Sequence, residues 1–201
     1  MTPLILIPGA GASSRMGEKD KLLEQVDGLP LIARQSRVAL ATGLPVVVTI
    51  PAGNLPRATA LTLVAHQNLS VLVIEQPENG LSESVKQGAQ AAARYDGMIV
   101  VLADLPELEP DDLIHFASEV AKKPDTVARA TDETGGKGHP VFVPHSYLSK
   151  AEGLSGDRGL AELLENDAPR RIPLRAAKAT TDLDTPEEWQ NWRAGYAGGR
   201  Y

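Results

Sequence analysis

The sequence has no cysteine, no excess of positive charge and no long apolar run among its 201 residues. The lack of cysteine excludes disulfides, thiolate metal sites and a cysteine nucleophile. A net charge of −6 argues against a surface that coats nucleic acid. The N-terminus has no basic leader, and its apolar run is too short for a signal peptide or a membrane helix. We therefore expect a soluble, cytoplasmic protein that binds neither nucleic acid nor membranes.

Strand patterns alternate with helical patterns through the first two-thirds of the chain. Short apolar runs predict buried strands at residues 4–7, 45–50, 71–74 and 98–103, each followed by a helical pattern. This alternation predicts a three-layer α/β/α domain with a mostly parallel, Rossmann-like sheet. Strand patterns at 126–130 and 141–143 predict a small antiparallel addition. We expect a single domain over residues 1–194 and a loose tail at 195–201.

A strand, a loop of small residues and two cations follow one another near the N-terminus. The loop, PGAGASS at residues 8–14, lets other atoms approach its backbone closely. Its N–H groups can form a cradle for phosphate, and the two cations that follow can meet phosphate oxygens. The pattern predicts a site for a nucleoside triphosphate, formed by Ala10, Gly11, Ala12, Ser13, Ser14, Arg15 and Lys21.

Two better-known glycine loops compete for the same stretch. A P-loop needs two glycines five positions apart, followed by Lys and Ser or Thr, and neither Gly9 nor Gly11 has such a partner. The dinucleotide fingerprint G-x-G-x-x-G is half present, because Ser14 holds the third glycine position. A loop that merely turns the chain also fits the glycines, although the neighbouring cations argue against it.

Carboxylates follow a strand in the middle of the chain and recur near its end. Asp104 lies at the carboxyl end of the most apolar strand pattern, the edge at which open α/β sheets bind ligands. Because Mg²⁺ prefers oxygen donors, Asp104 is a candidate metal ligand, with a turn cap as the alternative. Asp182 and Asp184 would point to the same side of an extended segment, as surface charges or as ligands. Thr185 and Glu188 predict a capping box at the start of the last helix.

The segment from Asn79 to Ser84 has two interpretations. Gly80 and Ser82 could contact the nucleotide at the start of a helix. Alternatively, Ser84 and Gln87 form a capping box, and the serines serve the helix alone.

Two later loops also have a functional and a structural interpretation. The loop GGKGHP at 135–140, with Gly138 and His139, could close over a substrate as a lid or simply connect a hairpin. The stretch GDRG at 156–159 resembles a G-D-x-G motif, which implies that Asp157 contacts a substrate, but Asp157 could equally cap a short helix.

The N-terminal stretch resembles the signature of nucleotidyltransferases with a GT-A-like fold, L-A-A/G-G-x-S-x-R-M-G-x-x-x-K. Aligned on the run RMG at 15–17, the residues that fall on the signature's other positions are Ala10, Gly11, Ser13 and Lys21. The sequence departs from it at Pro8 and Gly9, where the family usually has Leu-Ala. Five segments in the family's order cover nearly the whole chain, and together they resemble the molybdenum cofactor cytidylyltransferases.

The resemblance implies roles for the other segments. The run LADLP at 102–106 resembles the motif L-x-D-x-P, whose Asp binds the metal. The run DLDTPE at 182–187 resembles D-x-D/N-T-P-E, which implies Asp184 as the second ligand and Asp182 as its substitute. By the same resemblance, the loop before the third helix lies beside the nucleotide, and the acceptor contacts Gly138, His139 and Asp157.

These motifs together imply a Mg²⁺-dependent nucleotidyltransferase, with Arg15, Lys21 and Asp104 as catalytic residues. Ala10 resembles the branch of the family that transfers cytidine, so the implied donor is CTP and the implied acceptor is molybdopterin. A molybdoenzyme or its maturation factor is a further implied partner. The alternatives are guanylyl transfer, transfer to a sugar or polyol phosphate, a non-catalytic nucleotide-binding protein, and an NAD-dependent oxidoreductase.

Overall fold

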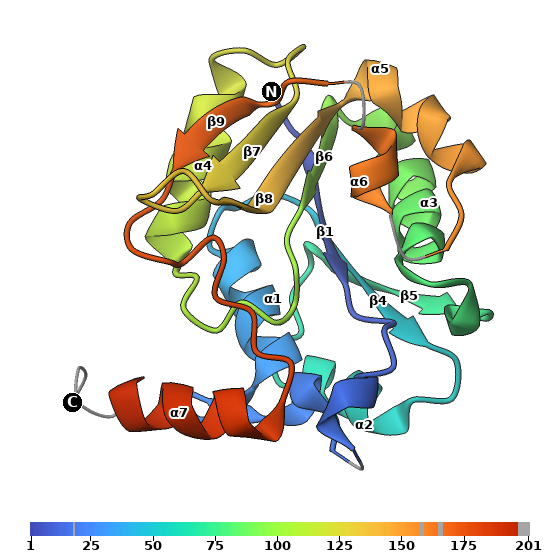
Figure 1. The fold of residues 1–201 in the computed structure, drawn as a ribbon. Coiled ribbons are helices and arrows are strands. Elements are labelled where there is room, and N and C mark those ends of the chain that lie inside the picture. The colour runs from blue at the N-terminus through green and yellow to red at the C-terminus, as the bar shows by residue number, and fades with distance from the viewer. Residues whose placement is uncertain (18, 157–158, 165–166, 197–201) are drawn as a thin grey trace.

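A seven-stranded sheet runs through the middle of the protein, in the order β5-β4-β1-β6-β8-β7-β9 (Figure 1). This computed structural model describes residues 1–17, 19–156, 159–164 and 167–196. The strands are β1 (Leu4–Pro8), β4 (Val46–Pro51), β5 (Leu69–Ile74), β6 (Gly97–Val100), β7 (Ala128–Thr131), β8 (Lys137–Pro144) and β9 (Arg170–Pro173).

The sheet is parallel in its first half and mixed in its second. Strands β5, β4, β1 and β6 pair in parallel, whereas β8 is antiparallel to both β6 and β7. Strand β9 is again parallel to β7. The predicted α/β class, the mostly parallel sheet and the antiparallel addition are therefore confirmed.

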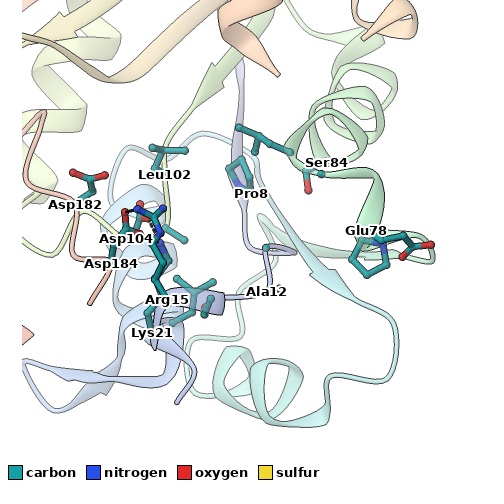
Figure 2. A pocket seen from close by; sticks show the side chains of 17 residues that line it. Pro8, Ala12, Arg15, Lys21, Glu78, Ser84, Leu102, Asp104, Asp182 and Asp184 are labelled. Atoms are coloured by element: carbon teal, nitrogen blue, oxygen red, sulfur yellow. Dashed lines mark hydrogen bonds and ion pairs between the residues drawn. The ribbon is translucent and has the colours of Figure 1, made fainter. Parts of the chain in front are cut away.

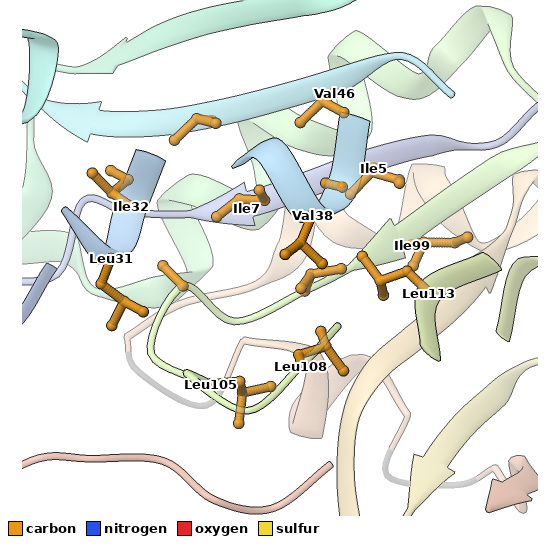
Figure 3. Packing of buried hydrophobic residues seen from close by; sticks show 14 of the residues in the cluster. Ile5, Ile7, Leu31, Ile32, Val38, Val46, Ile99, Leu105, Leu108 and Leu113 are labelled. Carbon is orange, nitrogen blue, oxygen red and sulfur yellow. The ribbon is translucent and has the colours of Figure 1, made fainter. Parts of the chain in front are cut away.

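Helices cover both faces of the sheet. They are α1 (Leu31–Leu40), α2 (Leu55–Thr62), α3 (Leu81–Ala91), α4 (Pro110–Ala121), α5 (His145–Leu148), α6 (Leu160–Leu163) and α7 (Pro186–Tyr196). Ile5 and Ile7 of β1 belong to one core, with side chains of α1 and α4 (Figure 3) and with Trp189 of α7. Leu4 and Leu6 belong to the other core, with side chains of α3 and α6. Successive side chains of a strand point to opposite faces, so a strand that is covered on both faces needs an unbroken apolar run.

Short elements fill the connection between β1 and α1. They are the 3₁₀ turns η1 (Ser14–Met16) and η2 (Lys21–Leu23) and a hairpin of β2 (Gln25–Val26) and β3 (Leu29–Pro30). The hairpin turns through Asp27 and Gly28, whose φ angles are 51° and 75°. The dinucleotide interpretation of the loop is wrong, because that fingerprint opens a long helix directly and α1 begins only at Leu31.

Three expectations differ from the structure. Lys137–Pro140 pairs as part of β8, so the 135–140 segment is a hairpin connection and a strand rather than a lid. Ser84 lies inside α3, which begins after Gly80, so the capping box with Gln87 is wrong. Helix α7 continues through the first two residues of the predicted tail to Tyr196, and residues 197–201 lie outside the described part.

None of the helices within the described ranges combines the length and the apolar character that crossing a membrane requires.

Candidate functional site

A cavity of about 540 Å³ opens at the carboxyl ends of the parallel strands (Figure 2). Its size is typical of small-molecule sites, and its position is the edge at which open α/β sheets bind ligands. The predicted site residues that line it are Gly11, Ala12, Ser13, Arg15, Lys21, Gly80, Asp104, Asp182 and Asp184. The fold thus gathers residues from four separate segments of the chain.

The loop after β1 is held against β4 by its backbone. The Gly9 N–H donates to the Thr49 hydroxyl over 3.1 Å. A side chain at Gly9 would place its Cβ 2.7 Å from the Thr49 carbonyl oxygen, so only glycine fits this approach. This contact accounts for the glycine at a position where the resembled signature has Ala.

Beyond Gly9 the same loop presents a row of backbone donors to the cavity. The N–H groups of Gly11, Ala12 and Ser13 make no hydrogen bond within the described part of the chain, and all three residues line the cavity. Ser13 has a φ of 51°, the left-handed conformation that a non-glycine residue rarely adopts. Successive unpaired N–H groups around such a residue form an anion-binding concavity.

Lys21 lies between two carboxylates at the edge of the cavity. Its Nζ is 2.5 Å from Asp104 Oδ2 and 2.7 Å from Asp184 Oδ1. Arg15 adds a second cation, with its Nη1 2.6 Å from Asp184 Oδ2. Burial alone would lower the pKa of Lys21, but the charges and hydrogen bonds of the two carboxylates outweigh it and raise this pKa. The lysine is therefore charged throughout the physiological range.

The second carboxylate is fixed by the first turn of α7. The carboxylate of Glu188 accepts from the N–H groups of Asp184 and Thr185, at 2.8 and 2.9 Å. The Glu188 N–H donates in return to the Thr185 hydroxyl, so the predicted capping box is confirmed. The two accepted N–H bonds lower the pKa of Glu188. The cap thus holds the backbone of Asp184 as well as the helix start.

The two carboxylates on Lys21 fit a divalent cation. Asp104 Oδ1 is buried and has no hydrogen-bond partner, which leaves an unused oxygen donor of the kind that Mg²⁺ and Mn²⁺ prefer. Asp182 lines the same cavity, and burial together with the charges of Asp104 and Asp184 raises its pKa. Within the described residues, no group of three or more His, Asp or Glu side chains gathers to hold a metal. Asp104 and Asp184 are therefore the pair that could share one ion, with other ligands supplied by the substrate.

Of the two residues predicted at the start of α3, Gly80 and Ser82, one lines the cavity, and their contact with the nucleotide stays a prediction. Gly80 lines the cavity, with a φ of 82°. Ser82 does not line it: its hydroxyl donates to the Asn79 carbonyl over 3.1 Å, and the residue is buried. Ser84 lies on the cavity instead and accepts a 2.9 Å bond from the Thr49 hydroxyl.

Two of the three residues expected to meet the acceptor, Gly138 and His139, can be placed in the structure. Gly138 packs so closely that an added Cβ would lie 2.0 Å from the Ala179 carbonyl oxygen. The His139 ring lies 3.3 Å from the Val100 carbonyl oxygen, and burial lowers its pKa to about 4. Neither residue is among those that line the cavity, and Asp157 lies outside the described residues. Acceptor contact by these three residues stays a prediction.

Two residues of the nucleotide prediction stand apart from the cavity lining. Ala10 is buried, and Ser14 begins the turn η1. Their roles stay predictions.

Sequence reasoning missed three polar residues that hold the loops of the site. Thr49 joins the β1 loop to α3, and the Gln35 side chain of α1 donates to the Leu105 carbonyl over 2.5 Å, next to Asp104. Arg57 of α2 contacts the β1 loop itself. Arg57 and Gln35 lie in helical patterns and Thr49 in a strand, so the only available signal was a polar residue at a position expected to be buried.

The fold, the two carboxylates and the unpaired backbone N–H groups of residues 11–13 are those of a nucleotidyltransferase of the GT-A-like class. The family model that matches is the MobA-like NTP transferase domain, over residues 5–172. The match covers most of the chain, so the protein belongs to the MobA-like NTP transferase family.

The chain is also similar to individual known proteins. The chain is 30% identical to a probable molybdenum cofactor guanylyltransferase of Natronomonas pharaonis, over 94% of this chain and 95% of the relative. It is 27% identical to the purine catabolism protein PucB of Bacillus subtilis, over 90% of each chain. Among solved structures, the manganese complex of Rv0371c from Mycobacterium tuberculosis superposes with a TM-score of 0.73 at 20% identity, over 95% of this chain and 97% of that one. This last likeness shows the shared fold.

Proposed function

We propose that the protein transfers a nucleoside monophosphate from CTP to a phosphorylated acceptor, molybdopterin, and releases pyrophosphate. The observation that carries the proposal is the position of Lys21. Its Nζ bridges Asp104 and Asp184, beside the unpaired N–H groups of residues 11–13. Mere nucleotide binding does not need two carboxylates at the phosphate site. Nucleotidyl transfer uses them, because a metal ion held by carboxylates would neutralise the negative charge that develops on the phosphates.

The loop and the two cations would bind the triphosphate. The N–H groups of residues 11–13 would donate hydrogen bonds to the phosphate oxygens, and Arg15 and Lys21 would turn from the carboxylates to the phosphates. Both cations are within reach, because the cavity that they line also contains the loop. Their charges would stabilise the negative charge that develops on the leaving pyrophosphate.

The chemistry requires no covalent intermediate with the protein. An oxygen of the acceptor phosphate attacks the α-phosphorus, and the bond from that phosphorus to the bridging oxygen of the β-phosphate breaks. A phosphate oxygen is already ionised at neutral pH, so no side chain has to remove a proton. Asp104 and Asp184 would hold Mg²⁺, which supplies neutralisation of the phosphate charge when bound. The protein's part is to hold the two substrates in line.

The base specificity has two candidates. Ala10 resembles the cytidylyl branch of the family and favours CTP. The relative from Natronomonas pharaonis, named a probable molybdenum cofactor guanylyltransferase, favours GTP as the second candidate.

Pyrophosphate release tests the proposal directly. The protein is incubated with CTP, GTP, ATP or UTP, with molybdopterin and with Mg²⁺, Mn²⁺ or a chelator. We expect release that depends on the acceptor and on the metal and is fastest with CTP. A clear preference for GTP would overturn the cytidylyl assignment. Tight nucleotide binding without turnover, with any acceptor or metal, would leave a nucleotide-binding protein and refute the enzyme.

A further inference from the structure

Helix α2 begins with a cation where the helix dipole favours an anion. Arg57 lies in the first turn, and its N–H donates to the side chain of the N-cap residue Asn54 over 3.0 Å. A positive charge at a helix N-terminus is unfavourable, and its side chain is only 3% exposed. Burying such a charge is costly unless every donor is paired. The hydrogen bonds of the guanidinium must therefore offset the cost of burying its charge at this position.

All five N–H donors of this guanidinium make hydrogen bonds to the loop after β1 or to Asp20. Nη1 donates to the carbonyl oxygens of Gly9 and Gly11, at 2.6 and 2.8 Å. Nε and Nη2 donate to the two carboxylate oxygens of Asp20, at 2.7 and 2.8 Å. Nη2 also reaches the Ser13 hydroxyl at 3.3 Å. One side chain thus joins three residues of the loop after β1 to Asp20, the residue that precedes the turn η2.

These contacts have a consequence for the triphosphate site. Because Arg57 binds the carbonyl oxygens of Gly9 and Gly11, it fixes the loop whose residues 11–13 carry the unpaired N–H groups and line the cavity. Asp20 accepts the Leu22 N–H over 3.0 Å and so begins the turn η2, whose first residue is Lys21. The same guanidinium therefore fixes both the N–H row and the backbone of the lysine.

We propose that Arg57 is a positioning residue, which holds the 9–13 loop and Lys21 in the arrangement that binds the triphosphate. The proposal rests on the proposed nucleotidyl transfer for its reaction, but its binding part concerns phosphate alone. Arg57 contacts the loop from behind and does not line the cavity. Its effect therefore passes through the backbone that it holds.

The test uses Arg57→Lys and a matched control, Arg34→Lys. Lysine keeps the charge but has three donors and no planar fork, so the contacts to both carbonyls and to Asp20 cannot all be kept. Arg34 is also a buried arginine, 2% exposed, and it pairs with carboxylates and a carbonyl away from the loop. Both variants should melt at a lower temperature than the wild type. Titration calorimetry with inorganic pyrophosphate and Mg²⁺ then compares the phosphate site at a temperature where both variants are folded.

We expect Arg57→Lys to weaken pyrophosphate binding about tenfold and to lower turnover on the order of a hundredfold, since small displacements of a catalytic geometry have such effects. Arg34→Lys should bind pyrophosphate as the wild type does. Equal losses of affinity in the two variants, or no loss in Arg57→Lys, would overturn the positioning role.

A second variant keeps the test decisive if Arg57→Lys fails to fold. Asp20→Asn preserves an oxygen for the turn η2 but removes the charge that pairs with Arg57. It should weaken pyrophosphate binding in the same direction, and wild-type affinity would overturn the proposal. If the wild type binds pyrophosphate but transfers no nucleotide to any acceptor, the proposed function fails while the binding comparison still decides the role of Arg57.

Discussion

Lys21 bridges Asp104 and Asp184, and its removal should change the binding of metal and of triphosphate in opposite directions. In the ligand-free protein its ammonium group occupies the position between the two carboxylates that would otherwise be open to a divalent cation. A metal that binds this pair without nucleotide has to displace the lysine. Lys21→Met removes the charge and keeps much of the apolar stem, so we expect metal binding to strengthen while triphosphate binding weakens.

The size of the effect follows from the two ion pairs. Their distances are 2.5 and 2.7 Å, and the side chains are only 15–16% exposed, so water screens them little. A hydrogen bond between charged groups contributes about 1.5–3 kcal/mol, and the two bonds of one ammonium are not additive. Taking about 2 kcal/mol as the net cost of displacement, Lys21→Met should bind Mn²⁺ about thirtyfold more tightly in the absence of nucleotide.

Titration calorimetry measures both sides of this prediction. Mn²⁺ is titrated into the wild type and the variant without nucleotide, and pyrophosphate is then titrated at saturating Mn²⁺. We expect tighter Mn²⁺ binding but about tenfold weaker pyrophosphate binding, because the variant has lost a charge-assisted donor. Lys122→Met, at an exposed ion pair with Glu119 on α4, serves as the control and should change neither. Unchanged or weaker Mn²⁺ binding in Lys21→Met would refute the reasoning.

Three further predictions follow from the same geometry. Asp104→Asn should lower turnover on the order of a hundredfold or more, measured as pyrophosphate release, and circular dichroism should show an intact fold. Burial lowers the pKa of His139 from 6.5 to about 4, so protonation favours the unfolded chain: the stabilisation is complete above pH 6.5 and is lost as the pH falls toward 4. Urea unfolding at pH 7 and pH 4.5 should therefore show a smaller pH-dependent loss in His139→Gln than in the wild type, and equal losses would count against the burial argument. Gly138→Ala should destabilise the fold by about 2–4 kcal/mol, because its Cβ would lie 2.0 Å from a backbone oxygen of Ala179, whereas Gly153→Ala meets nothing within 4 Å and should melt near the wild-type temperature.

The local parts of the site could be predicted because their signals are local. The strand β1 follows from an unbroken apolar run, and the loop after it follows from small residues before two cations. The capping box of α7 needs only a threonine and a glutamate three positions apart. Asp104 could be placed at the ligand edge because it directly follows an apolar strand, and that edge is common to open α/β sheets.

The segment around His139 shows where local signals mislead. Glycines and a lysine before the histidine suggested an open loop, but Lys137 pairs with Thr131 of β7, and the segment forms the first part of β8. Strand pairing is a property of two segments, so the composition of one of them does not determine it. The same limit applies to Ser84, whose hydroxyl meets Thr49 across 35 positions of the chain rather than capping its own helix.

The sequence by itself determined the strands, the phosphate-loop composition and the three side chains Lys21, Asp104 and Asp184 as candidates. Only the tertiary structure decided that one ammonium group bridges the two carboxylates, which lie 83 and 163 positions away along the chain. It also decided that Arg57, an ordinary-looking residue of a helix, holds the loop by its carbonyl groups. The physical reason is that hydrogen bonds and ion pairs depend on separations of a few ångströms in space, and those separations are fixed by the packing of the sheet and its helices rather than by spacing along the chain.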